Sequence, residues 1–106
     1  MVEFPDKTIY VYDRTIDFRK GIASLTNLIQ VSFPGADLNR CLFLFFSRNA
    51  RQVKIIEIEK DNVWLYQNRL DKHRFVFPKA DKSIRITTAE LKLILRTVEP
   101  VKRKKA

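Results

Sequence analysis

An unbroken apolar run near the middle of the chain limits the folds available to it. The run extends from Cys41 to Phe46 and is followed by the polar, basic segment 47–51. A strand with one solvated face would alternate apolar and polar residues, whereas this run has no polar residue to place in water. We therefore expect a strand that is buried on both faces.

Other segments have the composition of strands or follow a turn signal. In segment 52–59, the adjacent residues Ile55 and Ile56 interrupt the alternation of polar and apolar residues, as a β-bulge would. Turn residues at 60–62 predict a tight connection between two antiparallel strands. The predicted strands cover residues 8–12, 52–59, 63–67 and, as a short edge segment, 84–86.

Two segments carry apolar residues at helical spacing. The first stripe ends at segment 33–35 and consists of Phe18, Ile22, Leu25 and Ile29. Thr87 and Glu90 have the spacing of a capping box at the start of the second helix. Its stripe runs up to Pro100 and consists of Leu91, Ile94, Leu95 and Val98.

The order of these elements is β-α-β-β-β-(β)-α, which predicts an α+β fold. We expect an antiparallel sheet of about four to five strands packed by two helices. A chain of 106 residues has room for one modest core. We therefore expect one domain over residues 1–99 and a basic, disordered tail over residues 100–106.

The balance of charge indicates an acidic partner. The formal net charge is +9, of which +4 lies between Lys102 and Lys105, so residues 1–99 are also basic. Nucleic acid is the commonest partner of such chains. The sequence has no apolar run of membrane-spanning length and no secretory leader, which predicts a cytoplasmic protein. The single cysteine, Cys41, cannot form an internal disulfide, in agreement with a reducing compartment.

The segment from Asp17 to Gly21 places two cations where the first helix is expected to begin. Asp17 suits the N-cap position, but the positive end of the helix dipole disfavours Arg19 and Lys20 in the first turn. One interpretation is that both side chains join the helix N–H groups in binding an anion such as phosphate, with Gly21 allowing close approach. The other is that Asp13 and Asp17 form ion pairs with them.

Two further basic stretches are candidate contacts for nucleic acid. Arg48 and Arg51 occupy the expected hairpin tip. In segment 68–78 cations interleave with aromatic residues, so that cations could bind phosphates while rings stack on unpaired bases. The alternative is that its rings face the core and its cations are merely solvated. The candidates there are Arg69, Lys72 and Arg74 for phosphate, and Phe75 and Phe77 for base stacking or a protein interface.

Catalytic and metal chemistry find little support in the residues present. Glu57, Glu59 and Asp61 alternate and could hold Mg²⁺ for phosphodiester cleavage. We expect a solvated acidic face instead, because strand faces alternate polar and apolar residues by default. Cys41 and His73 are too few for a structural zinc site. With only two glycines, the chain has no glycine-rich phosphate loop. We expect no cofactor and no metal.

A set of landmarks runs in order through almost the whole chain: segments 15–21, 42–45, 54–55, 64–66, 69–70 and 74–75, Pro78, and a final leucine-rich helix. This ordered set resembles the TnpB accessory proteins of insertion-sequence family sixty-six. The resemblance implies a small non-catalytic helper encoded beside a separate, large transposase of the acidic-triad type.

The hypothesis that follows is an accessory protein of transposition that binds transposon DNA, the large transposase of the same element, or both. Two alternatives stay open at this point. One is a small metal-dependent nuclease that uses Glu57, Glu59 and Asp61. The other is a protein-interaction module whose interface includes Phe75 and Phe77, with the charges only steering the encounter.

Overall fold

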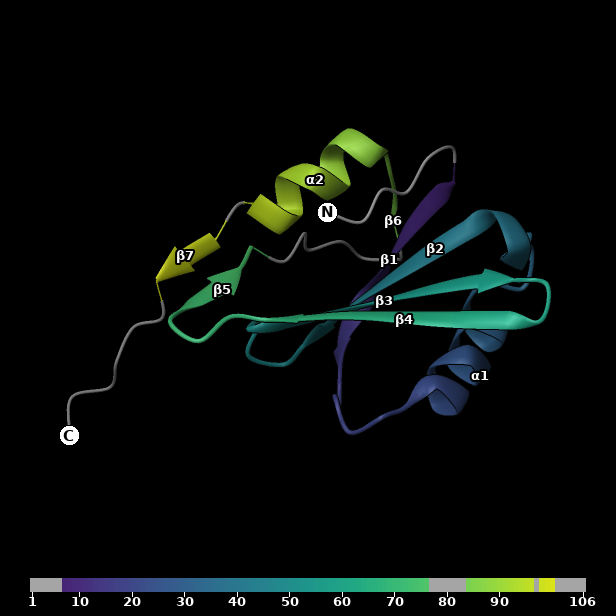
Figure 1. Cartoon of the computed structure of the whole chain (residues 1–106), viewed down its shortest axis with the longest axis horizontal. Coiled ribbons are helices and arrows are strands. Elements are labelled where there is room, and N and C mark those ends of the chain that lie inside the picture. The colour runs from purple at the N-terminus through teal and green to yellow at the C-terminus, as the bar shows by residue number, and fades with distance from the viewer. Residues whose placement is uncertain (1–6, 77–83, 97, 101–106) are drawn as a thin grey trace.

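The computed structural model describes residues 7–76, 84–96 and 98–100 (Figure 1). Residues 101–106 of the predicted tail, together with Phe77 and Pro78, lie outside the described residues. The elements are β1 (Thr8–Ile16), α1 (Ile22–Ser32), the 3-10 helix η1 (Leu38–Arg40), β2 (Cys41–Ser47), β3 (Gln52–Glu59), β4 (Asn62–Arg69), β5 (His73–Phe75), β6 (Ile84–Ile86), α2 (Thr88–Arg96) and β7 (Val98–Pro100).

The main sheet has five strands in the order β4-β3-β2-β1-β6. Its pairs are antiparallel except one: β1 and β2 run parallel, with Ile9 opposite Leu42. The helix α1 lies between these two strands in the chain and carries the chain back to the starting end, as a parallel pair requires. The α+β class is confirmed, while the expectation of a wholly antiparallel sheet is corrected to a mixed one.

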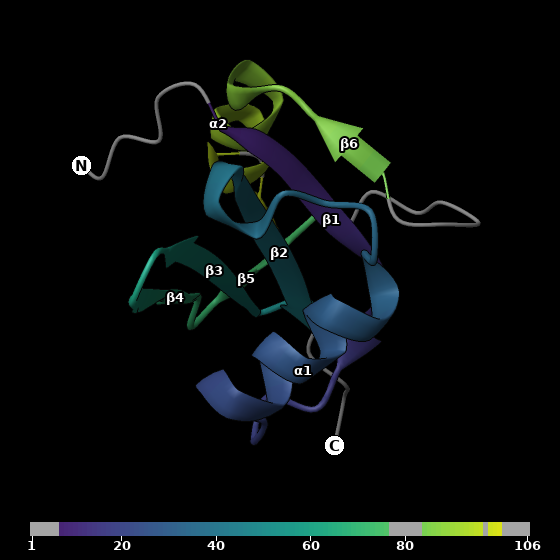
Figure 2. The ribbon, with the colours of Figure 1, turned by 90° about the vertical axis from the view of Figure 1, so that its right-hand side faces the viewer.

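The two helices cover opposite faces of the sheet, as Figure 2 shows. On one face, Leu25, Ile29 and Phe33 from α1 and its end pack on Phe43 and Phe45. On the other, Leu91 from α2 packs in a cluster that includes residues of β1, β2, β3 and β5. Every residue of β2 is buried, which confirms the strand that the apolar run predicts.

Burial on both faces also explains β3. Its pairing with β2 and β4 is continuous, so the bulge expected at Ile55 and Ile56 is wrong. Ile55 joins the cluster on the α2 face and Ile56 the cluster on the α1 face. Adjacent apolar residues need no irregularity here, because neither face of β3 is open to water.

The last helix begins as its sequence predicts and ends earlier. The backbone N–H of Thr87 donates to Glu90 Oε1 at 3.0 Å, and the Glu90 N–H donates to Thr87 Oγ1 at 3.1 Å. This is the expected capping box. The helix ends at Arg96, and Val98 belongs instead to β7, which pairs with β5 in a small second sheet. Within the described residues, no helix is both long and apolar enough to cross a membrane.

Candidate functional site

The first helix begins later than its sequence predicts. Gly21 is the N-cap residue of α1, in an extended conformation, and no side chain caps the helix. Asp17 is therefore not the N-cap, which corrects the expectation from sequence. Instead, Lys20 donates its backbone N–H to the carbonyl oxygen of Asp17 at 3.1 Å, closing a turn over residues 17–20. Arg19 and Lys20 thus lie in a loop before the helix, so the conflict with the helix dipole disappears.

Asp17 organises this loop through Arg19. Its Oδ1 accepts the backbone N–H of Arg19 at 2.9 Å, and its carboxylate accepts the side-chain Nε at 3.0 and 3.1 Å and Nη2 at 2.6 Å. These hydrogen bonds hold the pKa of Asp17 well below its usual range and raise the pKa of Arg19. The ion-pair interpretation is confirmed for these two residues. Asp17 uses two of the five guanidinium N–H groups of Arg19, which leaves three for other partners.

A buried lysine fixes the same loop from inside the protein. Lys54 lies on β3 and is 5% exposed. Its Nζ donates to the carbonyl oxygens of Phe18 at 2.8 Å and Lys20 at 2.9 Å, and it lies 4.8 Å from the centre of the Phe18 ring. Sequence reasoning missed this role. The available signal was a lysine at a position of β3 that shares its face with Ile56, in an otherwise apolar stretch.

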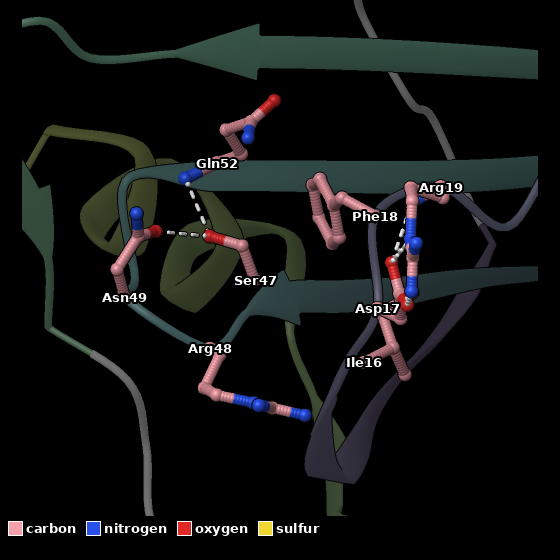
Figure 3. A pocket seen from close by; sticks show the side chains of 8 residues that line it. All are labelled: Ile16, Asp17, Phe18, Arg19, Ser47, Arg48, Asn49 and Gln52. Atoms are coloured by element: carbon pink, nitrogen blue, oxygen red, sulfur yellow. Dashed lines mark hydrogen bonds and ion pairs between the residues drawn. The ribbon is translucent and has the colours of Figure 1, made fainter.

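The loop forms one wall of an open depression with a volume of about 540 Å³ (Figure 3). The opposite wall is the hairpin that joins β2 to β3. Figure 3 shows the Arg48 side chain extending from this hairpin toward the side of Ile16 and Asp17. The lining residues are Ile16 from the end of β1, Asp17, Phe18 and Arg19 from the loop, and Ser47, Arg48, Asn49 and Gln52 from the hairpin.

Hydrogen bonds within the hairpin fix its shape. Ser47 Oγ donates to Asn49 Oδ1 at 2.8 Å and accepts the backbone N–H of Gln52 at 3.0 Å. Asn49 Oδ1 also accepts the backbone N–H of Arg51 at 3.0 Å. Ala50 takes a positive φ of 58° at the tip. The predicted hairpin is confirmed, and its side-chain bonds hold the backbone from which Arg48 projects.

Three backbone contacts place further basic segments next to the hairpin, at the same end of the sheet. Arg69 faces Gln52 across the β3–β4 pair, so it lies on the same face as Gln52. The N–H of Leu70 donates to Arg51 at 2.8 Å, and that of Phe75 donates to Ala50 at 2.7 Å. We call this region the basic end, and define it by Arg19, Lys20, Arg48, Arg51, Arg69, Lys72 and Arg74.

The aromatic residues of segment 68–78 do not join this surface as a stacking platform. Phe75 is 1% exposed and packs edge-on against Phe46, with ring centres 6.1 Å apart. The expectation that it stacks on a base or lines an interface is therefore wrong, because the core position of β5 buries its ring. Phe77 lies outside the described residues.

The acidic residues of β3 meet a lysine instead of solvent. Lys7 Nζ lies 2.6 Å from Glu57 Oε2 and 3.1 Å from Glu59 Oε1, and the Tyr66 hydroxyl donates to Glu57 Oε1 at 2.8 Å. Glu57 is 8% exposed, so the expected solvated acidic face is wrong for it. Burial opposes a charged Lys7, but its bonds to both glutamates outweigh this and raise its pKa.

This arrangement leaves the nuclease hypothesis without a site. The Lys7 ammonium group occupies the space between the Glu57 and Glu59 carboxylates that a metal ion would need. Asp61 lies in the exposed turn after β3. The described residues contain no cluster of three or more His, Cys, Asp or Glu side chains suited to a metal. Cys41 is buried, which raises the pKa of its thiol, and it begins β2 at the end away from the hairpin.

Comparison with known proteins gives a family match over nearly the whole chain. The profile of a family described as "IS66 Orf2 like protein" matches residues 7–105. A protein of Sinorhizobium fredii described as "Uncharacterized protein y4hO" is 32% identical over 84 residues, which cover 78% of this chain and 73% of that protein. No solved structure matches the chain.

Proposed function

Because this chain belongs to the IS66 Orf2-like family, it is an accessory protein of transposition, and we propose that it binds the phosphate backbone of transposon DNA through the basic end. The large transposase of the same element is its second proposed partner. We propose that the chain binds both partners in the cytoplasm. The proposal concerns binding only, and assigns no chemical step to the chain.

The observation that carries the proposal is the convergence of separate basic segments. Arg19 and Lys20 come from the loop before α1, Arg48 and Arg51 from the β2–β3 hairpin, and Arg69 from the end of β4. Although these segments are far apart in the sequence, they lie together at one end of the sheet. Several cations on one surface act together on a polyanion, because each phosphate that they neutralise releases condensed counterions.

The depression provides a place for a phosphate group between two of these cations. Arg19 and Arg48 lie on its two walls, and Asp17 holds the Arg19 side chain in a defined orientation. An arginine that is already oriented loses less conformational entropy on binding. On the remaining polar wall, Asn49 uses its side-chain oxygen within the hairpin, so its amide NH₂ group can donate hydrogen bonds at the rim.

Burial of Phe75 restricts the kind of recognition that we propose. A ring inside the core cannot stack on an unpaired base, so contact is assigned to the sugar-phosphate backbone. Such contacts fix position and contribute affinity, but carry no direct information on base sequence. Sequence preference, where it exists, would then come from the transposase.

The same surface suits an acidic segment of the transposase. The pairing of Asp17 with Arg19 already shows how a carboxylate engages this guanidinium group, with bonds to both Nε and Nη2. A carboxylate offered by a protein partner has the same planar geometry. Co-purification of the chain with the transposase after nuclease treatment tests this partner, and loss of the complex on nuclease treatment assigns it to shared DNA.

The experiment that tests DNA binding compares two double variants with the same loss of charge. Arg19→Gln/Arg48→Gln removes both cations of the depression. The control, Arg40→Gln/Lys60→Gln, removes two cations at the opposite end of β2 and β3. Fluorescence anisotropy with a labelled duplex of the transposon end, measured over a range of salt concentrations, gives affinity and salt slope for each.

We expect the depression variant to lose about two units of salt slope and at least about tenfold in affinity at low salt, since each lost phosphate contact removes about one unit. The control should stay within about twofold of the unmodified chain. Equal losses of affinity in both variants would mean that net charge alone explains the effect, and would overturn the assigned site. Failure of the unmodified chain to bind the duplex at low salt would overturn DNA binding itself.

A further inference from the structure

The strand β4 forms a long edge of the main sheet. It ends the strand order and, among the described residues, pairs only with β3 (Figure 1). It has eight residues, whereas β6 at the other edge has three. A long edge strand presents a row of backbone N–H and C=O groups that can pair with another strand, so natural sheets usually keep their edges short or guarded.

β4 lacks most of the usual guards, and its one charged residue is Arg69 at its end. Its pairing with β3 runs without a bulge from Gln52 opposite Arg69 to Glu59 opposite Asn62. The strand contains neither proline nor lysine. Trp64, in its middle, is 52% exposed, which is a large apolar surface to leave in water. These features are typical of a strand that pairs with another chain.

The sequence of β4 is complementary to itself when it is paired antiparallel about Leu65. Residue pairs across a two-fold axis through the Leu65 pair share a face of the sheet, so their side chains meet. An aromatic pair would form twice, Trp64 with Tyr66. At both ends of the seam, Asp61 of one copy, in the turn directly before β4, would face Arg69 of the other. A register moved by two residues would place Arg69 opposite Val63 and lose this charge pair.

We propose that two copies of this chain pair through β4 in this register, so that their sheets form one continuous sheet. Charge complementarity between Asp61 and Arg69 favours a second copy over an unrelated strand, because it is satisfied twice by the same sequence. Antiparallel pairing also places the two basic ends at opposite ends of the shared seam. The positive charges that we propose to bind DNA therefore do not repel each other across the seam.

The two charged residues cannot meet within one chain. Asp61 directly precedes β4 and Arg69 is the last of its eight residues, so at about 3.3 Å per residue they are roughly 26 Å apart. Any energetic coupling between Asp61 and Arg69 therefore reports contact between copies. Exchanging the charges of Asp61 and Arg69 is therefore a specific test of the proposed register.

The test measures the dimer dissociation constant of the full chain by analytical ultracentrifugation, without DNA and at moderate ionic strength. Three variants are compared: Arg69→Glu, Asp61→Arg, and both together. Lys92→Glu, on an exposed position of α2, is the control with the same change of charge as Arg69→Glu. Circular dichroism establishes that each variant is folded.

We expect the unmodified chain to be a dimer at tens of micromolar. Each single variant should raise the dissociation constant about tenfold or more, since it makes two like-charge pairs per dimer. The double variant should return close to the unmodified value, and Lys92→Glu should leave it unchanged. A monomeric unmodified chain, including one that pairs through β4 with a strand of the transposase, overturns the proposal. A dimer whose double variant is no better than the singles overturns it as well.

Because DNA is absent, these outcomes do not depend on the proposed function. An unmodified chain that binds DNA normally but is monomeric would overturn only this inference, and an unmodified chain that dimerises but does not bind the duplex at low salt would overturn only DNA binding. Trp64→Ala adds a second probe, which lies outside the basic end. It should weaken the dimer and leave the affinity of the monomer for DNA unchanged.

Discussion

The ammonium group of Lys54 lies 2.8 Å from the backbone carbonyl oxygen of Phe18, across 36 residues of sequence. A second bond to the carbonyl of Lys20 closes a clamp on the loop that carries Arg19. The side chain is almost wholly inside the protein, yet the surface that it supports is exposed. The core of β3 thereby sets the position of a cation that we assign to DNA.

Removing this clamp should lower both stability and DNA affinity. Lys54→Met keeps most of the volume but leaves two carbonyl groups without their charged donor, and we expect a loss of about 1–3 kcal/mol in the free energy of unfolding. Urea unfolding measures it. Lys60→Met, in an exposed turn, is the control and should stay within about 0.5 kcal/mol. An unchanged affinity for duplex DNA in folded Lys54→Met would show that the loop does not need the clamp.

Lys7 and Glu57 should be strongly coupled. Their side chains are 15% and 10% exposed, so Lys7→Met leaves the Glu57 carboxylate largely buried without its cation. We expect this to destabilise the fold by about 2 kcal/mol, and the pairing of Lys7→Met with Glu57→Gln to recover part of the loss. Glu59, whose side chain is 51% exposed, is the matched control. Equal coupling of Lys7 to both glutamates in a double-mutant cycle would contradict this account.

Stability should fall in alkali because of Tyr66. Burial, followed by its hydrogen bond to Glu57, raises the pKa of Tyr66 to about 12 from an ordinary value of 10.0. The unfolded chain loses this proton first, so the contribution is complete below pH 10 and is lost as pH rises from about 10 to 12. Solvent screening limits the loss to about 1 kcal/mol.

Tyr66→Phe should remove this part of the alkaline loss, which thermal or urea unfolding at several pH values can measure. Tyr12→Phe removes a hydroxyl group from the other face of the sheet and serves as the control. The same slope of stability against pH in the unmodified chain and in Tyr66→Phe would assign the loss to other groups.

Phe75 should behave as a core residue and not as a DNA contact. Phe75→Leu keeps an apolar side chain in the cluster around Phe46 but loses the edge-on ring contact. We expect a loss of about 1–2 kcal/mol in unfolding free energy, with unchanged affinity of the folded protein for single-stranded and duplex DNA. A selective loss of affinity for single strands would restore the stacking interpretation.

Local patterns predicted most of the secondary structure. Burial of the run from Cys41 to Phe46, the capping box of Thr87 and Glu90, and the short edge strand 84–86 were all readable, because each depends on neighbours in sequence. The candidate cations were identified for the same reason. Their assembly at one end of the sheet was not readable, because it follows from the pairing of β3 with β4 and from single backbone bonds such as that between Phe75 and Ala50.

The sequence by itself determined the class of fold, the two amphipathic helices and the surplus of positive charge. Only the tertiary structure decided that β1 and β2 run parallel, that α1 starts at Ile22, and that Lys7 lies between Glu57 and Glu59. Each of these depends on contacts between segments that are far apart in the chain. The loop from Asp17 to Lys20 illustrates the reason: Asp17 suits a helix N-cap locally, but Lys54 binds two carbonyl groups of the loop and holds it as a turn.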